Sequence, residues 1–281
     1  MTQLTLTKHQ ALGNDFLVAF DPPDVDLAAL ARGMCDRRRG IGADGLLVGT
    51  SADGFDARMV LYNADGSRAE MSGNGIRCFA QALASRLGRA GELCVLTDAG
   101  ARLVAISPSA EGPAAARIEA AVDMGEIAEI DEPADWHRIG TDPHRPVRHL
   151  SVGNPHAVVG VEDVAVVDLV AIGAIVPQIN VEIIEPGPET HAVTMRVHER
   201  GAGITEACGT GACASAWAAA AWGLVPASAA EILVHMDGGD AKVRLHEPST
   251  GRVTLIGPAE RIATITVDLA DIGVEKSTQR T

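Results

Sequence analysis

Two short segments of the chain place a hydroxyl or thiol residue directly before a glycine-rich turn. They are Met71-Ser72-Gly73-Asn74-Gly75 and Ala207-Cys208-Gly209-Thr210-Gly211. Cys208 follows Ser72 by 136 residues, and the same offset aligns residues 59–63 with residues 195–199. A recurrence of strand, loop and helix start together indicates an internal duplication. Two like halves facing each other would place these side chains on opposite faces of a bound molecule, which suits removing a proton from one face and replacing it from the other.

Both glycine-rich loops are candidate anion sites. The first backbone N–H groups of a helix have no partner within it, and the helix dipole is positive there, so a carboxylate or a phosphate fits either loop. The alternative is that both are simply glycine-rich turns that lead into helices. This alternative is less favoured because the two loops recur at the same position of the repeat. A helix start also stabilises a thiolate, so we expect the pKa of Cys208 to fall from about 8.5 toward neutrality.

The elements that position these loops follow from apolar periodicity and from turn residues. The first half predicts a helix at 27–35 and strands at 4–8, 16–20, 46–49 and 57–62. The second half predicts strands at 148–152, 157–161, 193–198 and 252–256. Alanine-rich helices are expected at 74–87 and 209–222. A last strand at 263–267, after Gly257-Pro258, is expected to cross back to the first half. The predicted domains are residues 1–122 with 263–281, and residues 123–262.

Composition bounds the class of protein. The chain has 281 residues, is 47% hydrophobic and carries a formal net charge of −14. It is long enough for two domains with buried cores. The negative charge and the lack of a lysine-rich stripe argue against a nucleic-acid or anionic-membrane surface. Five cysteines, an odd number, and no secretion signal at the amino terminus favour a reducing, cytoplasmic location with free thiols.

Other motifs favour less specific interpretations. The run from Gly209 to Ala214 matches a dinucleotide-binding fingerprint in form, but no hydrophobic strand leads directly into it, so we do not expect a nucleotide cofactor. The loop at 40–45 contains three glycines, which suit a close approach either to a ligand or, slightly favoured, to a neighbouring strand. The residues Arg37-Arg38-Arg39 are assigned no function. His137, His144 and His149 lack metal-ligand spacing, so no metal is expected.

Six motifs in order give the chain a resemblance to the diaminopimelate epimerase family. They are Leu12-Gly13-Asn14-Asp15-Phe16, Asn63-Ala64-Asp65-Gly66-Ser67, Gly73-Asn74-Gly75-Ile76-Arg77, Gly153-Asn154-Pro155-His156, Glu199-Arg200-Gly201 and Ala207-Cys208-Gly209-Thr210-Gly211. The resemblance covers nearly the whole chain. It implies an α/β (α+β) fold of two similar domains, each a mostly antiparallel sheet wrapped around a central helix, with the active-site cleft between them. It also implies a homodimer, no cofactor (a PLP-independent isomerase) and a role in lysine biosynthesis.

The resemblance also implies roles for particular residues. Cys208 matches one of two catalytic cysteines that face each other across the α-carbon of the substrate, and Ser72 stands where the other is expected. His156 and Glu199 match residues that tune the acidity of the cysteines. The backbone N–H groups of four loop residues would hold the reacting carboxylate: Gly73, Asn74, Gly209 and Thr210. The matches for recognition of the amino and carboxylate groups of the substrate are Asn14, Asn63, Asn154, Asn180, Glu199 and Arg200.

Ser72 is the main departure from the family pattern. A hydroxyl is a far weaker acid than a thiol, and general acid–base catalysis works best when the pKa lies near the working pH. Cys78 cannot substitute, because it lies six residues further on, inside the helix. Gly45 is a minor departure, at a position where some relatives have glutamine. We therefore expect ligand binding to be retained and turnover to be impaired.

Several alternatives remain open. Ser72 fits either a deliberate replacement of cysteine or a natural homologue with altered chemistry. The leading function is epimerisation of LL-diaminopimelate to the meso form. One alternative is a racemase, epimerase or dehydratase of another amino acid. The other is an amino-acid-binding protein without catalytic activity.

Overall fold

The computed structural model describes residues 3–108, 116–140, 142, 144–246 and 250–270. The chain divides into two compact units: residues 1–122 with 258–281 form unit 1, and residues 123–257 form unit 2. The first boundary falls within strand β8 (Arg117–Glu126) and the second within strand β17 (Arg252–Asp268). Unit 1 is therefore built from two separate stretches of the chain and unit 2 from one continuous stretch, and each of these two strands begins in one unit and ends in the other.

Unit 1 contains two helices and most of its strands in the first 108 residues. The helices are α1 (Leu27–Cys35) and α2 (Gly73–Leu87). The strands are β1 (Gln3–Ala11), β2 (Asn14–Phe20), β3 (Gly45–Thr50), β4 (Ala57–Asn63), β5 (Arg68–Ala69), β6 (Gly91–Thr97) and β7 (Gly100–Pro108), followed by the start of β8 and the end of β17.

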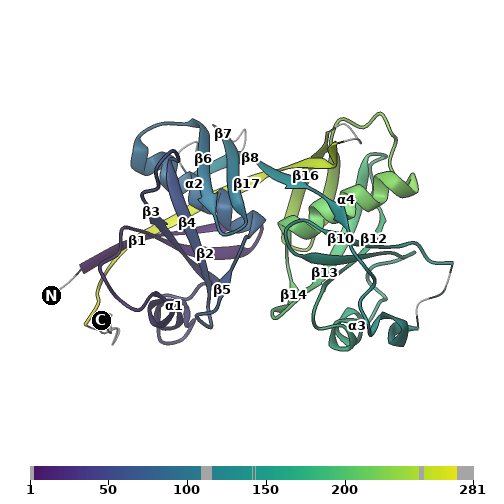
Figure 1. The fold of residues 1–281 in the computed structure, drawn as a ribbon, viewed down its shortest axis with the longest axis horizontal. Coiled ribbons are helices and arrows are strands. Elements are labelled where there is room, and N and C mark those ends of the chain that lie inside the picture. The colour runs from purple at the N-terminus through teal and green to yellow at the C-terminus, as the bar shows by residue number, and fades with distance from the viewer. Residues whose placement is uncertain (1–2, 109–115, 141, 143, 247–249, 271–281) are drawn as a thin grey trace. The chain divides into compact units, whose positions relative to one another are not determined.

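The strands of unit 1 form a sheet that surrounds α2. The order of neighbours is β17, β1, β2, β3, β4, β6, β7 and β8, and β17 also pairs with β8. Only the pairs β2–β3 and β4–β6 are parallel. Helix α2 contacts β1, β2, β3, β4 and β7, and Figure 1 shows it among these strands. The sheet therefore wraps around the helix.

Unit 2 contains the corresponding elements in the same order. Its helices are α3 (Leu169–Ile175), α4 (Gly209–Trp222) and the short 3-10 helix η1 (Trp136–Ile139). Its strands are β9 (Ala128–Glu129), β10 (Val147–Ser151), β11 (Pro155–Gly160), β12 (Asn180–Pro186), β13 (Ala192–Glu199), β14 (Gly203–Thr205), β15 (Ile232–Met236) and β16 (Gly239–Leu245), together with the start of β17.

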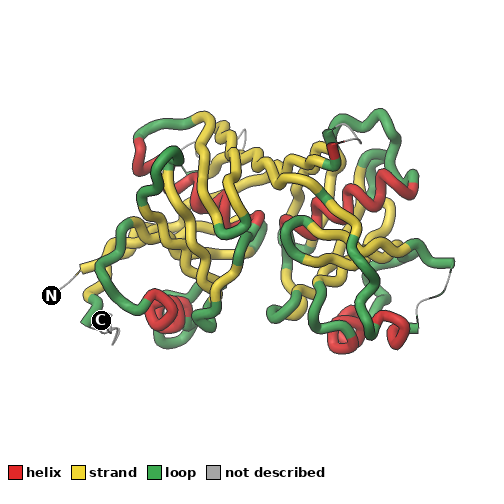
Figure 2. Tube along the Cα trace, in the orientation of Figure 1, coloured by secondary structure: helices red, strands yellow, loops and turns green. Residues whose placement is uncertain are grey.

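The pairing pattern of unit 2 repeats that of unit 1. Neighbouring strands follow the order β9, β10, β11, β12, β13, β15, β16 and β17, and only β11–β12 and β13–β15 are parallel. Helix α4 contacts strands β10 to β13, β15 and β16. The tube in Figure 2 shows how strongly strands predominate in both units. The expected duplicated fold, a mostly antiparallel sheet around one helix in each half, is confirmed.

The composition of the central helices follows from this enclosure. Alanine dominates α4 because strands pack around it and leave room only for small side chains; Ala212, Ala214 and Ala216 are fully buried. Helix α2 instead buries Arg77, which donates to Asn74 Oδ1 at 2.9 Å and to the Pro258 carbonyl at 3.2 Å. Both helices end at a left-handed glycine, Gly88 (φ 64°) and Gly223 (φ 72°), as expected for helix C-termini.

Three expectations from the sequence differ from the structure. Helix α3 and strand β12 were not expected from the sequence, although they repeat α1 and β3 of the first half. Residues 252–256 and 263–267 are parts of one strand, β17, because Gly257-Pro258 lies within the strand rather than ending it. The unit boundary accordingly lies at 257/258, whereas the sequence placed the domain boundary at 262/263.

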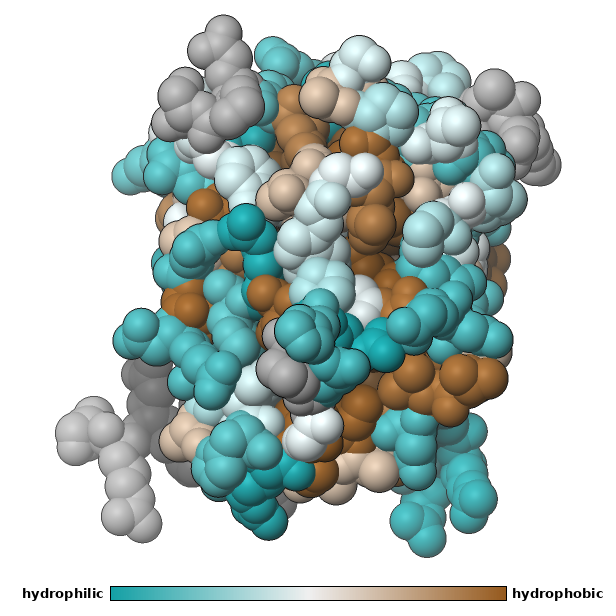
Figure 3. All heavy atoms as spheres, turned by 90° about the vertical axis from the view of Figure 1, so that its right-hand side faces the viewer, coloured by the Kyte–Doolittle hydropathy of each residue, from teal (hydrophilic) through white to brown (hydrophobic). Residues whose placement is uncertain are grey.

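The surface is mixed in character. On the face drawn in Figure 3, hydrophobic residues lie between hydrophilic ones. The exposed large hydrophobic side chains include Val166 and Val170, which are 78% and 59% exposed. Across the residues that the structure describes, none of the helices is long and apolar enough to cross a membrane.

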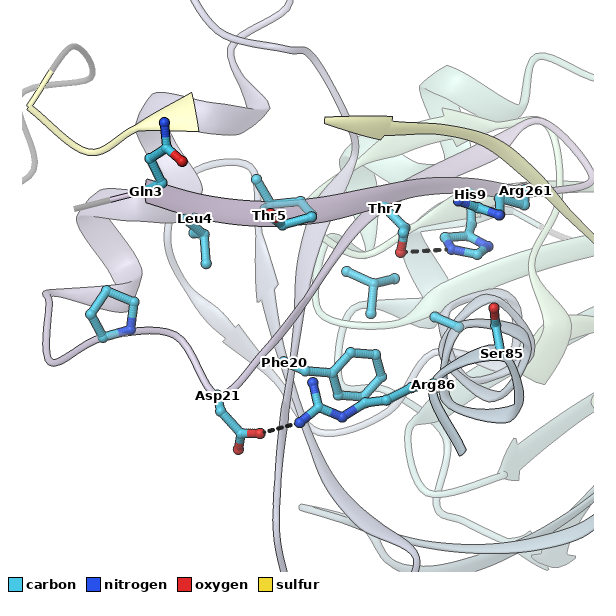
Figure 4. Close-up of a pocket in the computed structure, with 14 residues that line it drawn as sticks. Gln3, Leu4, Thr5, Thr7, His9, Phe20, Asp21, Ser85, Arg86 and Arg261 are labelled. Carbon is cyan, nitrogen blue, oxygen red and sulfur yellow. Dashed lines mark hydrogen bonds and ion pairs between the residues drawn. The ribbon is translucent and has the colours of Figure 1, made fainter. Parts of the chain in front are cut away.

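A pocket of about 410 Å³ lies beside β1 in unit 1 (Figure 4). Several of its polar side chains are paired with each other: Arg86 donates to Asp21 at 2.7 Å, and His9 Nε2 lies 2.9 Å from Thr7 Oγ1. Among the described residues that line it, none belongs to the Ser72 loop. The pocket is therefore separate from the candidate chemistry of this unit.

His9 makes the stability of the protein depend on pH. The side chain is fully buried with Nδ1 2.8 Å from Gln81 Oε1, and burial lowers its pKa to about 4. The unfolded chain takes up a proton near pH 6.5, but the folded chain does so only near pH 4. We predict that His9 lowers the free energy of unfolding by up to about 3 kcal/mol as the pH falls through this window.

Denaturant unfolding at pH 7.5 and pH 4.5 tests this prediction. The His9→Asn variant should lose less stability between the two pH values than the parent chain. His137→Asn, which changes an exposed histidine, is the control and should behave like the parent. An equal loss in His9→Asn and in the parent would contradict the prediction.

Candidate active site

The loops that contain Ser72 and Cys208 have the same local structure. Each residue is the N-cap of its central helix, with φ and ψ of −140° and 122° for Ser72 and −125° and 112° for Cys208. Ser72 Oγ accepts from the Gly75 N–H at 3.0 Å, and Cys208 Sγ accepts from the Gly211 N–H at 3.4 Å. Side-chain oxygen or sulfur at an N-cap bonds to the first helical turn in this way. The duplication is therefore preserved at the atoms that carry the candidate chemistry.

The Cys208 half-site is the part of unit 2 formed by the Cys208 loop and the polar side chains packed around it. Cys208 itself is only 4% exposed, and Thr210 Oγ1 lies 3.4 Å from its sulfur. Glu199, at the end of β13, faces the thiol and accepts a hydrogen bond from Thr205 Oγ1. Burial raises the pKa of the Glu199 carboxyl.

The electrostatics of Cys208 differ from those expected. Burial raises the pKa of the Cys208 thiol well above its usual value, and the carboxyls of Glu199 and Glu182 raise it further; the bonds to Thr210 and Gly211 oppose them. The expectation of a pKa lowered toward neutrality is therefore wrong in this structure. The helix start favours the thiolate, but loss of water and two nearby carboxyls disfavour it more strongly. The resting form is the thiol.

A hydrogen-bonded pair lies beneath the start of α4. His156 Nδ1 lies 2.7 Å from Glu182 Oε1, and both side chains are fully buried. His156 Nε2 lies 2.9 Å from Asn154 Oδ1, and Asn154 Nδ2 donates to Thr210 Oγ1 at 3.3 Å. His156 and Asn154, two predicted site residues, are thus connected to the Cys208 loop within one unit. Glu182 was not identified from the sequence.

Asn180 is the first residue of β12, and Arg200 directly follows the end of the neighbouring strand β13. Asn180 is 3% exposed; its Nδ2 donates to the Pro155 carbonyl at 3.1 Å, and its Oδ1 accepts from the Arg200 N–H at 2.8 Å. These bonds hold the backbone at Arg200 beside the strand that carries His156. The Arg200 side chain is exposed. The structure therefore gives Asn180 a positioning role, and its direct contact with a ligand stays a prediction.

The Ser72 half-site is the corresponding part of unit 1. Asn14 Oδ1 accepts from Asn74 Nδ2 at 3.3 Å, and Asn14 Nδ2 donates to Asp44 at 2.7 Å. Asn63 is the exposed last residue of β4, and its Nδ2 donates to Ser67 Oγ at 3.0 Å. Asn14 thus lies beside the loop with Gly73 and Asn74, whereas a contact of Asn63 with a ligand stays a prediction.

The remaining motifs of unit 1 have structural roles. Arg37 donates to Asp15 and Asp44, both at 2.7 Å, so it forms ion pairs within the chain. Although burial raises the pKa of Asp15, the bonds from Arg37 and Lys8 hold it below its usual value. A Cβ at Gly45 would lie 2.8 Å from the Tyr62 carbonyl. The favoured interpretation, close approach to a neighbouring strand, therefore holds for Gly45.

Cys78 is unsuited to catalysis. Cys78 is fully buried inside α2, and burial raises its pKa to about 12, so it cannot replace a thiol at position 72. Within the described ranges, no group of three His, Cys, Asp or Glu side chains could hold a metal ion.

Comparisons with known proteins give a consistent result along the chain. The diaminopimelate epimerase family model matches residues 6–128 and 149–262. The diaminopimelate epimerase of Halothermothrix orenii is 37% identical over 287 aligned residues, which cover 93% of this chain and 97% of that protein. The diaminopimelate epimerase of Thermosynechococcus vestitus is 38% identical over 285 residues, with 91% and 96% coverage.

Solved structures show the same fold at lower identity. A phenazine biosynthesis protein of the PhzF family from Bacillus anthracis has a TM-score of 0.76 at 15% identity, covering 96% of this chain and 100% of that chain. A hydroxyproline epimerase from Agrobacterium vitis, solved with trans-4-hydroxy-L-proline, has a TM-score of 0.69 at 16% identity, with 96% and 94% coverage. These likenesses concern the fold alone.

Glu199 should control the acidity of Cys208. We predict that Glu199→Gln lowers the pKa of the Cys208 thiol, because a negative charge beside the thiolate is removed. The ¹³Cβ chemical shift of Cys208, followed against pH and assigned with a Cys208→Ser variant, measures this directly. Glu206→Gln changes an exposed carboxyl two residues before Cys208 and should leave the titration unchanged. An identical titration curve in Glu199→Gln and in the parent would refute the assignment.

Proposed function

Because the chain belongs to the diaminopimelate epimerase family, we propose that its two half-sites act on one molecule of diaminopimelate and move the proton at its α-carbon without a cofactor. The observation that carries this proposal is the pair of matched N-caps, Ser72 and Cys208, each at the start of an enclosed helix. The family's reaction converts the LL isomer to the meso isomer in lysine biosynthesis. The proposed product therefore differs from the substrate only in the configuration of one carbon.

The backbone of the two loops supplies the proposed binding of the reacting carboxylate. A helix start directs N–H groups toward its N-terminal end, where a carboxylate accepts their hydrogen bonds. Gly73 and Asn74 begin one such helix, and Gly209 and Thr210 begin the other. Donors of this kind also stabilise the negative charge that develops on the carboxylate as the α-proton leaves. Replacing a cysteine by Ser72 leaves these backbone groups in place.

Side chains near the loops are proposed to recognise the rest of the diamino diacid. Asn14 and Asn63 belong to the Ser72 half-site, and Asn154, Glu199 and Arg200 belong to or lie beside the Cys208 half-site. Amide groups and a carboxylate can together bind both the ammonium and the carboxylate of an amino acid group. Asn180 is proposed to act here through the backbone of Arg200.

The proposed proton transfer uses Cys208 on one face of the α-carbon. The Cys208 thiolate takes the α-proton and becomes a thiol, while the bonding electron pair remains on the substrate as a carbanion stabilised by its carboxylate. Inversion then requires a second acid that gives a proton to the opposite face. Ser72 is a poor acid for this step because its hydroxyl pKa lies far above neutrality. Return of the proton from Cys208 restores the original isomer, so exchange without inversion is the expected outcome.

A second candidate is a racemase, epimerase or dehydratase of another amino acid, or a non-catalytic amino-acid-binding homologue. The likeness to a hydroxyproline epimerase fold supports the former, and Ser72 supports the latter. We favour diaminopimelate because the family match spans both halves.

From the same resemblance we propose a homodimer and a cytoplasmic location, which light scattering and cell fractionation would test.

We predict that Cys208 exchanges the α-proton of one stereoisomer whereas inversion is slow or absent. Each isomer of diaminopimelate is incubated with the protein in heavy water, and α-deuterium is followed by NMR. Because Cys208 rests as a thiol, the exchange rate should rise with pH as the thiolate fraction grows. Cys208→Ser is the control and should abolish exchange. Rapid interconversion of LL and meso isomers would refute this prediction, and binding without exchange of any isomer would favour the non-catalytic homologue.

We predict that Ser72→Cys restores epimerisation by supplying the missing thiol. The expected gain in kcat is about a hundredfold or more, the usual contribution of a positioned acid or base. Stereoisomer-resolved chromatography measures the rate, with Ser51→Cys as a control that adds a thiol at an exposed position elsewhere in unit 1. If Ser72→Cys binds diaminopimelate yet remains inactive, the substrate or the reaction differs from the one proposed.

A further inference from the structure

Glu182 is a fully buried carboxyl that packs against the first turn of the catalytic helix. It lies on β12, and a Cβ added at Gly211 would come within 2.6 Å of its Oε1. Its other oxygen, Oε2, has no hydrogen-bond partner among the described residues. A buried carboxyl is costly unless it is paired. The contact with His156 Nδ1 at 2.7 Å is therefore what stabilises it.

The bonds around His156 fix where its protons lie. Asn154 Oδ1 can only accept, so His156 Nε2, at 2.9 Å from it, carries a hydrogen and donates. The contact of 2.7 Å between His156 Nδ1 and Glu182 Oε1 is then a second hydrogen bond of the same ring. This pair therefore holds Nε2–H as a donor toward Asn154, and a histidine without the carboxyl partner has no such constraint.

The orientation of His156 determines the orientation of the Asn154 amide. With its Oδ1 held by His156, Asn154 turns its N–H groups toward Thr210 Oγ1, which lies 3.3 Å away. Thr210 Oγ1 in turn lies 3.4 Å from Cys208 Sγ. A continuous series of hydrogen bonds thus connects the buried Glu182 carboxyl to the reactive sulfur.

The other half of the duplication lacks this pair. In unit 1, Phe16 pairs with Gly45 across the parallel strands, as His156 pairs with Asn180 in unit 2. Leu47 lies two residues beyond Gly45, and Glu182 lies two residues beyond Asn180. The two side chains therefore occupy equivalent positions in the two units. A Cβ at Gly75 would lie 3.4 Å from Leu47 Cδ2, as one at Gly211 would lie against Glu182.

The two asparagines are correspondingly oriented in opposite ways. Asn14 offers its Oδ1 to the helix residue Asn74, and its Nδ2 donates to Asp44. Asn154 offers its Nδ2 to the helix residue Thr210. The difference follows from the group that holds each amide: the Asp44 carboxylate accepts from Asn14 Nδ2, whereas His156 Nε2 is bonded to Asn154 Oδ1.

We propose that Glu182 is a positioning residue of the Cys208 half-site: paired with His156, it holds the Asn154 amide with its N–H groups toward the start of α4, where they donate to an acceptor group of the substrate. The identity of that substrate rests on the proposed function. The orientation of His156 and Asn154 does not, so it can be tested on the ligand-free chain.

The first experiment measures the protonation of the His156 ring by ¹⁵N NMR of the ligand-free, full-length protein at pH 7, assigned with a His156→Gln variant. In the parent chain, Nε2 should be fully protonated. In Glu182→Leu, the Nε2 proton should be partly lost, because the imidazole can then adopt its other tautomer while the Asn154 amide flips. Glu182→Gln, whose amide can donate to Nδ1, should restore Nε2–H. Full Nε2 protonation in Glu182→Leu would overturn the proposal.

The second experiment measures affinity for LL- and meso-diaminopimelate by calorimetry. The double variant His156→Phe/Glu182→Leu copies Phe16 and Leu47, which are buried at the equivalent positions of unit 1, so it should fold with little change in Tm. Its affinity should fall about tenfold, as for the loss of one hydrogen bond to a charged group. The control Glu185→Gln, on the same strand, should bind normally. Unchanged affinity in the double variant would overturn the proposal. If the parent chain binds neither isomer, the proposed function fails, while the NMR experiment still decides the role of Glu182.

Discussion

The structure depends on one constraint: each unit wraps its sheet around one helix and buries the first turn of that helix together with most of its body. Burial of the helix contributes to the core of each unit, and the N-cap bonds of Ser72 and Cys208 mark where each helix begins. The candidate chemistry lies at these helix starts, because the first N–H groups of a helix have no partner within it. Stability and binding arise from the same arrangement of backbone groups.

The duplication preserves this arrangement but not the charges around it. Both units repeat the same order of parallel and antiparallel strands, so equivalent positions pack against equivalent turns. At those positions unit 1 has apolar side chains, and unit 2 has an imidazole and a carboxyl. A duplicated backbone can thus carry two half-sites with different electrostatics, which is what a reaction with one base and one acid requires.

Binding and proton transfer use different atoms in the proposed site. Backbone N–H groups and amide side chains recognise a ligand without a thiol, whereas transfer of the α-proton depends on the acidity of a single side chain in each half. A change from sulfur to oxygen at position 72 therefore affects the second property far more than the first. The raised pKa of Cys208 further separates binding from proton transfer. A neutral thiol does not repel the carboxylate of a ligand, but it ionises reluctantly.

The sequence by itself determined the duplication, the two loops, the central helices and the family, because an offset of 136 residues and six short motifs are local patterns that survive without knowledge of packing. It did not reveal α3 or β12, because short apolar runs do not by themselves distinguish a helix from a strand. Only the tertiary structure placed Glu182 beside His156, 26 residues away, and beneath the start of α4. It also decided the acidity of Cys208, because a pKa depends on burial and on charges that strand register brings together, and neither is a property of neighbouring residues in the chain.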